Sequence, residues 1–145
     1  MSLSFISIIL LLLSITPLHF SLAKKCLLSQ DHQVHIINKL PSNSPQLKIH
    51  CASKDDDLGD HYPTINEDFN WSFCQTVFGK TLFFCHFWWG SKDKVFDVYN
   101  DPLYCVKQGK QINYLDYCKW EVREDGFYLE QFDDDKYYME RIWGW

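Results

Sequence analysis

Three segments of the chain alternate between apolar and polar residues. They are residues 46–51, 69–74 and 118–123. Successive side chains of a β-strand point to opposite faces, so this period-two pattern predicts strands with one buried and one solvated face. The side chains expected to point inward are Leu47, Ile49, Cys51, Phe69, Trp71, Phe73, Cys118, Trp120 and Val122.

Residues 81–89 follow a different pattern, because both faces of this segment are apolar. One face carries Leu82, Phe84, His86 and Trp88, and the other carries Phe83, Cys85, Phe87 and Trp89. A strand of this kind is either covered on both sides or presents an aromatic patch to its surroundings.

Further strands are expected at 34–40, 95–99, 127–132 and 137–143, separated by turn-forming residues at 41–45, 79–80, 90–93 and 125–126. Short strands at this spacing, without an amphipathic helix between them, are typical of two packed sheets. The sequence therefore predicts an all-β fold, an antiparallel β-sandwich of seven to eight strands.

The N-terminal segment indicates export. Residues 3–23 contain no Asp, Glu, Lys or Arg, and the apolar centre at 5–13 is followed by Pro17 and by small residues near Ala23. This order of features predicts a secretory signal at 1–23 and one mature domain at 24–145. A membrane anchor is the alternative, which Pro17 and His19 disfavour. No other segment approaches spanning length, so the mature chain is not expected to insert into a membrane.

Composition narrows the function classes. The 145 residues include 17% aromatic residues, too many for a disordered chain. The chain has 14 Lys and Arg against 19 Asp and Glu, a net charge of -5. Because binding to phosphate groups needs a cationic surface, this balance disfavours nucleic-acid and anionic-membrane partners.

Six cysteines behind an export signal predict three disulfides, with 15 possible pairings. The alternation points Cys51, Cys85 and Cys118 inward and Cys74 outward. Cys105 lies in a loop, and Cys26 lies in the leading tail, from which it can reach Cys74. Zinc binding by the His-Cys neighbours at 50–51 and 85–86 is disfavoured, since adjacent side chains of a strand project to opposite faces. No metal or cofactor is expected. The cysteines are Cys26, Cys51, Cys74, Cys85, Cys105 and Cys118.

The remaining polar motifs have simple interpretations. The acidic runs at 55–60 and 133–135 lack the ligand spacing of a calcium-binding loop and are interpreted as solvated turns. Asn70 begins an Asn-Trp-Ser glycosylation sequon on the outward face of its strand. No catalytic motif occurs, and the negative charge argues against a small secreted nuclease, so the chain is not expected to be an enzyme.

Several segments together resemble the plant self-incompatibility protein family, the S-protein homologues. They are 34–40 (VHIINKL), 50–59 (HCASKDDDLG), 69–73 (FNWSF), 81–87 (TLFFCHF), 96–99 (FDVY), 118–122 (CKWEV) and 125–128 (DGFY). The resemblance implies a secreted, disulfide-stapled β-sandwich without enzymatic activity. Founding members of the family are stigma ligands sensed at the surface of incompatible pollen, and most homologues are regarded as secreted signalling ligands.

The resemblance also implies roles for particular residues. It pairs Cys51 with Cys118 and Cys85 with Cys105, leaving Cys26 and Cys74 for a tail-tethering bridge or as free or intermolecular thiols. It makes 54–59 a tight turn held by aspartate side chains. Contacts with a cell-surface or extracellular protein would fall on the loops at 41–45, 60–68, 90–94 and 101–113. The loop residues expected to bind are Asp60, His61, Lys92, Asp93, Lys107, Gln108 and Lys110.

An alternative function is a secreted carbohydrate- or cell-wall-binding module. Such a module would stack sugars on an exposed aromatic face made of Trp88, Trp89, Trp143 and Trp145. The competing interpretation is that these aromatic side chains fill the core.

Overall fold

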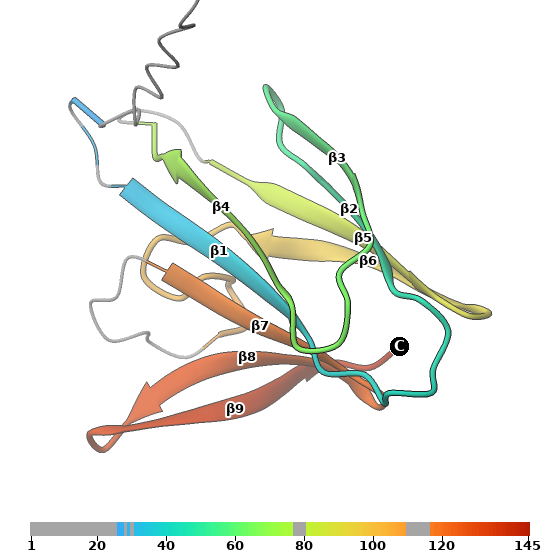
Figure 1. The fold of residues 1–145 in the computed structure, drawn as a ribbon. Helices are drawn as coiled ribbons and strands as arrows, with labels where there is room; N and C mark the ends of the chain where they lie inside the picture. Colours follow the sequence, from blue (N-terminus) through green and yellow to red (C-terminus); the bar gives the residue numbers. More distant parts are fainter. Residues whose placement is uncertain (1–25, 28, 30, 77–80, 110–116) are drawn as a thin grey trace, which may run out of the picture.

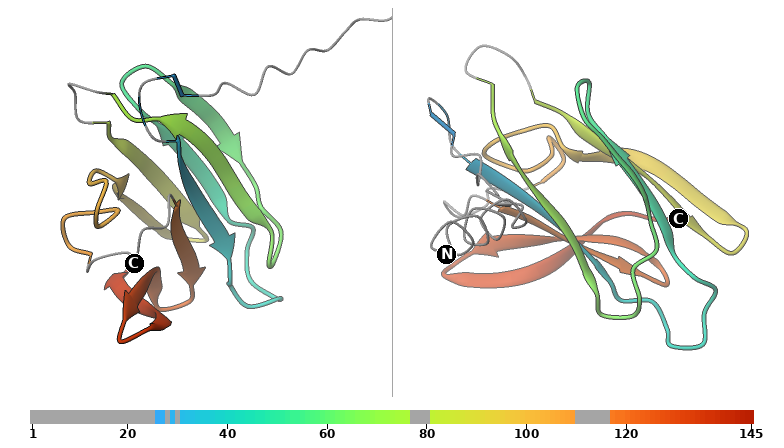
Figure 2. Two further views of the ribbon diagram at one scale, coloured as in Figure 1. Left: turned by 90° about the vertical axis from the view of Figure 1, so that its left-hand side faces the viewer. Right: turned by 45° about the horizontal axis from the view of Figure 1, so that its top comes forward.

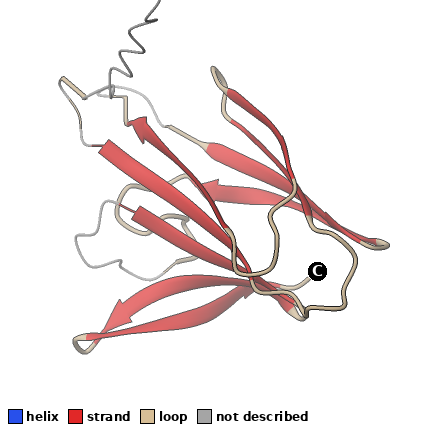
Figure 3. Cartoon of the chain, in the orientation of Figure 1, coloured by secondary structure: helices blue, strands red, loops and turns tan. Residues whose placement is uncertain are grey.

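The computed structural model describes residues 26–27, 29, 31–76, 81–109 and 117–145 (Figure 1). The predicted export segment therefore lies outside the described residues. Within them the chain forms β-strands and turns without a helix (Figure 3). The nine strands are β1 (Asp31–Asn38), β2 (Lys48–Ala52), β3 (Asp57–His61), β4 (Asp68–Cys74), β5 (Phe83–Trp89), β6 (Lys92–Tyr99), β7 (Tyr117–Arg123), β8 (Gly126–Asp133) and β9 (Lys136–Trp143).

The predicted all-β sandwich is confirmed. A five-stranded sheet in the order β4-β1-β7-β8-β9 faces a four-stranded sheet in the order β3-β2-β5-β6 (Figure 2). The strands number nine, where the sequence predicted seven or eight. One pair, β1 with β7, is parallel, so the predicted antiparallel arrangement does not hold for that pair. Across the described residues, no helix has the length and apolar character needed to cross a bilayer.

The core lies between the two sheets and is filled by the predicted inward faces. Cys118, Trp120 and Val122 of β7 are buried, as are Ile49 and Cys51 of β2. Aromatic rings join the sheets in a further set of contacts. Their centroids are 4.8 Å apart for Phe87 with Phe127, 5.2 Å for Phe96 with Trp120, and 4.7 Å for Phe73 with Phe83.

The acidic run at 55–60 was predicted to be a turn, and only its first part is one. Ser53 Oγ accepts the backbone N–H groups of Asp55 and Asp56, at 3.3 and 3.0 Å. The chain then enters β3, which the sequence prediction missed, because Leu58 packs against the core while Asp57 faces away from it. A glycine at position 59, with φ of 76°, allows the bulge in this short edge strand.

The six cysteines form three disulfides, and one of the predicted pairs is present. Cys26 joins Cys74, so the leading tail is tied to the end of β4. The pairing of Cys51 with Cys118 and of Cys85 with Cys105 is wrong: the bonds are Cys51–Cys85 and Cys105–Cys118.

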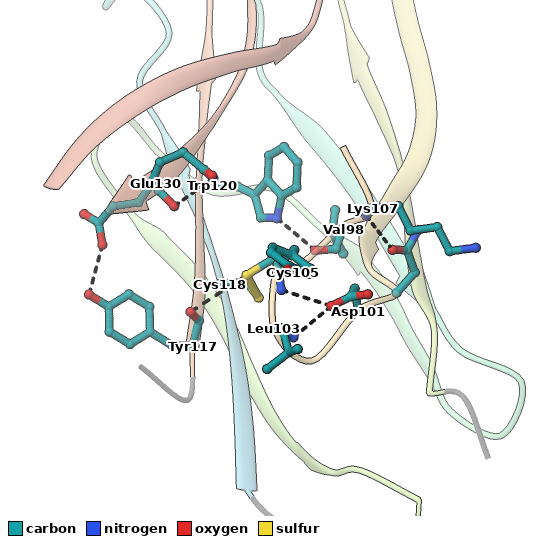
Figure 4. The surroundings of a disulfide bond; sticks show 12 residues. Val98, Asp101, Leu103, Cys105, Lys107, Tyr117, Cys118, Trp120 and Glu130 are labelled. Atoms are coloured by element: carbon teal, nitrogen blue, oxygen red, sulfur yellow. Dashed lines mark hydrogen bonds between the residues drawn. A yellow bond between two sulfur atoms is a disulfide. The ribbon is translucent and has the colours of Figure 1, made fainter. Parts of the chain in front are cut away.

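Strand register explains the correct pairing. Cys51 and Cys85 are direct cross-strand partners in the β2/β5 pair, with Cα atoms 4.1 Å apart. Both are inward-facing, but inward direction alone does not say whether the partner lies across the core or beside it in the same sheet. Cys105 lies in the loop after β6, from which its sulfur reaches Cys118 on β7 (Figure 4).

Loops leave the sandwich at two opposite ends (Figure 1). One end carries the connections 39–47, 62–67, 90–91 and 124–125 together with the C-terminus. The other end carries the connections 53–56, 100–109 and 134–135. This division decides which of the predicted binding loops can act together.

Candidate recognition surfaces

Three of the four predicted binding loops meet at one end of the sandwich. This surface, called the loop end below, consists of residues 41–45, 62–67 and 90–91. A Cβ at Gly90 would lie 3.5 Å from Pro45 Cγ, so the β5–β6 turn lies against the first loop. Gln46 Nε2 donates to the carbonyl of Tyr62 at 3.4 Å, which joins the first and second loops.

The 62–67 loop is held by hydrogen bonds from the end of β1 and by bonds within the loop itself. Asn38 Nδ2, which is buried, donates to the carbonyl of Pro63 at 2.9 Å, and Lys39 Nζ donates to Asn66 Oδ1 at 3.0 Å. Glu67 Oε2 accepts the backbone N–H of Thr64 at 2.7 Å. This N–H group lowers the pKa of the Glu67 carboxyl, since it bonds to the charged form.

The loop end also exposes apolar side chains. Tyr62 is 52% exposed and Ile65 is 39% exposed. Sequence reasoning missed both because it weighted the charged residues of this loop. The signal that could have identified them was a loop with one apolar residue directly before Pro63 and another directly before Asn66.

The charged residues predicted for this end lie largely in strands. Asp60 and His61 end β3, where His61 turns inward and its ring stacks on Phe69 with centroids 3.9 Å apart. Lys92 and Asp93 begin β6, because the turn before them has only two residues. These residues therefore flank the loop end instead of forming its tip.

The fourth predicted loop lies at the opposite end and is pinned to the sandwich. Asp101 Oδ1 accepts the backbone N–H groups of Leu103 and Tyr104, at 2.8 and 3.1 Å (Figure 4). Asn100 Oδ1 accepts the N–H of Lys107 at 3.0 Å. The Lys107 and Gln108 side chains are exposed, and Lys110 is outside the described residues. Because it lies at the opposite end of the sandwich, this loop does not form one continuous surface with the loop end.

The outer face of the four-stranded sheet carries the aromatic side of β5. Of the two alternatives for residues 81–89, the structure has the second, because Phe84, His86 and Trp88 point away from the core. Phe84 remains 38% exposed. Across from these residues lie Ala52, His50 and Lys48 of β2, in that order.

His50 lies between two carboxylates on this face. Its Nδ1 is 2.6 Å from Asp60 Oδ1, and its Nε2 is 2.8 Å from Asp57 Oδ1. The hydrogen bond with Asp60 raises the pKa of His50 above its ordinary value of 6.5, and Asp57 acts in the same direction. The pKa of Asp60 is lowered, first by His50 and then by Lys48. Sequence reasoning missed this cluster because its three members meet only through cross-strand pairing.

This geometry suits a fixed charge better than proton transfer. Both ring nitrogens of His50 are engaged, so no nitrogen is free to take a proton from a substrate. His86 Nε2 contacts Asp93 Oδ2 at 2.9 Å, and His35 contacts Asp68 and Gln33 through its two nitrogens.

The zinc alternative has no support in the geometry. Cys51 and Cys85 are bonded to each other inside the core, while His50 and His86 point to the outer face. Over the described part of the chain, no group of three or more His, Cys, Asp or Glu side chains is placed to hold a metal ion.

The four tryptophans of the carbohydrate alternative do not share a face. Trp89, Trp143 and Trp145 pack against the core, with the Trp89 and Trp145 rings 5.5 Å apart. Trp88 is on the outer face, where His86 stacks on it at 3.6 Å and Lys48 Nζ lies 4.6 Å from the ring centroid. These contacts occupy ring surface that a sugar would need, so no flat stacking platform is formed.

The comparison with known sequences agrees with this arrangement. The sequence profile described as plant self-incompatibility protein S1 matches residues 33–143, which takes in all nine strands except the first two residues of β1. The chain belongs to this family.

Curated relatives of this self-incompatibility family come from Arabidopsis thaliana. S-protein homolog 5 is 38% identical over 82 residues, covering 57% of this chain and 59% of the relative. S-protein homolog 2 is 34% identical over 109 residues, covering 75% of this chain and 65% of the relative. S-protein homolog 20 is 34% identical over 121 residues, covering 80% of this chain and 82% of the relative. The chain thus spans less than two thirds of the length of the first two. None of these names describes an enzyme.

Within this self-incompatibility domain, Asn70 has the position expected for a glycosylation site. It lies in the edge strand β4 and its side chain is exposed, with Nδ2 donating to the carbonyl of Asp68 at 3.3 Å.

Proposed function

We propose that this protein is a secreted recognition ligand that binds a cell-surface protein through its loop end. The observation that carries the proposal is a composite surface of three loops, linked by hydrogen bonds and packing, with Tyr62 and Ile65 exposed on it. A surface fixed before binding loses little conformational entropy on association, and buried aromatic anchors supply most of the affinity in protein interfaces.

Export is the second part of the proposal. The apolar segment 1–23 supports it, as do three disulfides, which form and persist in oxidising compartments. Membership of the self-incompatibility family adds support, since its name describes recognition between cells. The mature protein acts by binding, without catalysis or cofactor. Its net charge of -5 favours a protein partner over nucleic acid.

The export claim is tested by the intact mass of the full chain expressed in plant cells. We expect protein in the medium that starts near Lys24 and gains mass by alkylation at six cysteines only after reduction. Mass lost on treatment with a peptide-N-glycosidase would place an N-glycan on Asn70, and an Asn70→Gln variant should lack it. Retention in the cell with free thiols would contradict the proposal.

The binding claim is tested by surface cross-linking. Tagged mature chain is incubated with intact cells of the source plant, cross-linked, and the captured proteins are identified. Capture should fall at least five-fold with the Tyr62→Ser/Ile65→Ser variant and should be unchanged with Tyr137→Ser. Tyr137 is a matched control because it is 50% exposed at the opposite end of the sandwich. Equal capture by all three proteins would exclude the loop end.

A further inference from the structure

A cleft opens between the edge strands β3 and β4, at the end of the sandwich away from the loop end. The stacked rings of His61 and Phe69 close it on one side. Beyond them the two strands separate, and the space between the sheets opens into a cavity of about 1000 Å³. Its apolar lining includes Leu58, Trp71 and Phe83.

The rim of this edge cleft is acidic. Among the described residues that line it, Asp31, Asp55 and Asp56 are acidic and Lys54 is basic, a net charge of -2. The backbone N–H groups of Asp55 and Asp56 donate to the Ser53 hydroxyl oxygen, so the turn is held by this hydroxyl and not by the two carboxylates. Both carboxylates are on exposed residues and can meet a positively charged ligand.

The indole ring of Trp71 forms part of the apolar lining of the cleft. The Nε1 atom is buried and has no partner among the described residues. The ring itself is held by Phe69 and Phe83, with centroids 5.3 and 5.5 Å away. The indole N–H group is shielded from solvent, so a ligand in the cleft would contact the ring carbons of Trp71.

Strand β4 also has a free edge. Within the described residues it pairs only with β1, so the backbone groups of its other edge face the mouth of the cleft. Extended peptides bind such edges by adding a strand, while alternate side chains enter adjacent pockets.

We propose that the edge cleft binds an extended, basic segment of a partner protein. An apolar side chain of that segment enters the cleft against Leu58, Trp71 and Phe83, and its lysine or arginine side chains lie against Asp55 and Asp56. The inference deepens the proposed recognition role by giving the partner a second contact, at the end opposite the loops, and it rests on that role for its biological setting.

The direct test uses the purified, oxidised mature chain and synthetic peptides. The probe is a capped nine-residue peptide of alternating lysine and threonine with one central leucine. Two control peptides replace every lysine by glutamate or the leucine by serine. Binding is followed in ¹H–¹⁵N spectra at the Trp71 indole cross-peak, which a Trp71→Phe variant assigns. We expect the lysine–leucine peptide to shift this peak and to bind at least ten-fold more tightly than either control.

A charge-matched pair of variants separates the rim from general electrostatics. Asp55→Asn/Asp56→Asn should weaken binding of the lysine–leucine peptide at least five-fold. Asp134→Asn/Asp135→Asn makes the same charge change in the β8–β9 turn and should alter it less than two-fold.

Three outcomes would overturn the inference: no shift of the Trp71 peak, equal affinity for all three peptides, or equal loss in both double variants. The loop-end capture experiment does not use these peptides or variants. A negative result at the cleft would therefore not contradict the loop-end proposal, and a negative result in the capture experiment would not contradict peptide binding in the cleft.

Discussion

The side chain of Trp120 links the two sheets through a hydrogen bond. Its indole N–H, buried in the core, donates to the carbonyl of Val98 at 3.0 Å, from β7 to β6 (Figure 4). Trp120→Phe removes this donor, leaves a buried carbonyl without its partner and opens a small cavity. We expect a loss of about 1–3 kcal/mol in unfolding free energy, measured by urea denaturation at neutral pH.

The control for this variant is Trp88→Phe, on the outer face. Its ring stacks with His86 and lies 4.6 Å from Lys48 Nζ on the outer face of the sheet, so the loss in unfolding free energy should be clearly smaller. A Trp120→Phe protein as stable as wild type would contradict the assigned role of this hydrogen bond.

His50 should make stability depend on pH. Its folded pKa lies above 6.5, so the contribution of its ion pairs is fully present below pH 6.5 and is lost as the pH rises through the folded pKa. The difference in unfolding free energy between wild type and His50→Gln should therefore be larger at pH 5.5 than at pH 8.5. Asp60, whose pKa is lowered, stays charged at both values. A larger difference at pH 8.5 would contradict the assignment.

At the scale of single residues, the sequence predicts which face of a sheet a side chain lies on better than it predicts which residue that side chain contacts. Alternation correctly placed Cys118 and Trp120 in the core, because period two is a local property of the strand. It could not place Asp57 beside His50 or identify the acceptor of Trp120, since those contacts depend on which strands are neighbours. The disulfide error at Cys51 has the same origin.

At the scale of elements, the two core disulfides close chain segments of different length. Cys51–Cys85 spans 34 residues and Cys105–Cys118 spans 13. In the chain-entropy description these bridges stabilise by about 4 and about 3 kcal/mol. Both pairs are buried, so replacing each pair by alanine leaves comparable cavities. We expect Cys51→Ala/Cys85→Ala to destabilise the protein by about 1 kcal/mol more than Cys105→Ala/Cys118→Ala.

Thermal and urea denaturation of the two double variants, each with its remaining bridges mapped, measures this order. Equal destabilisation would show that loop length does not govern these bridges. A greater loss for Cys105→Ala/Cys118→Ala would show that the bridge instead fixes the 100–109 loop, in which Cys105 has a φ of 60°.

Eight of the nine strands were predictable, because each has a buried face or a β-rich composition bounded by turn residues. β3 was not, since Asp57, Gly59 and Asp60 are residues that strands normally avoid. Its formation depends on Leu58 reaching the core and on His50 neutralising the outward carboxylates. The parallel pairing of β1 with β7 could not be predicted from the sequence either, because strand order is set by packing of the whole chain.

At the scale of the whole molecule, the topology divides the binding loops between two ends. Residues 41–45, 62–67 and 90–91 act as one surface, whereas 100–109 belongs to the opposite end. The sequence predicted which segments are loops but not this division. The account therefore predicts that substitutions within the loop end are coupled with one another and independent of those at 100–109.

Competition binding on intact cells tests whether the loop end is the surface that binds the partner protein. Labelled mature chain is bound to cells of the source plant and displaced by unlabelled wild type, Tyr62→Ser/Ile65→Ser, Leu103→Ser or Tyr137→Ser. We expect saturable binding, full displacement by wild type, Leu103→Ser and Tyr137→Ser, and at least ten-fold weaker competition by the loop-end variant. Binding that does not saturate, or equal competition by the loop-end variant, would contradict it.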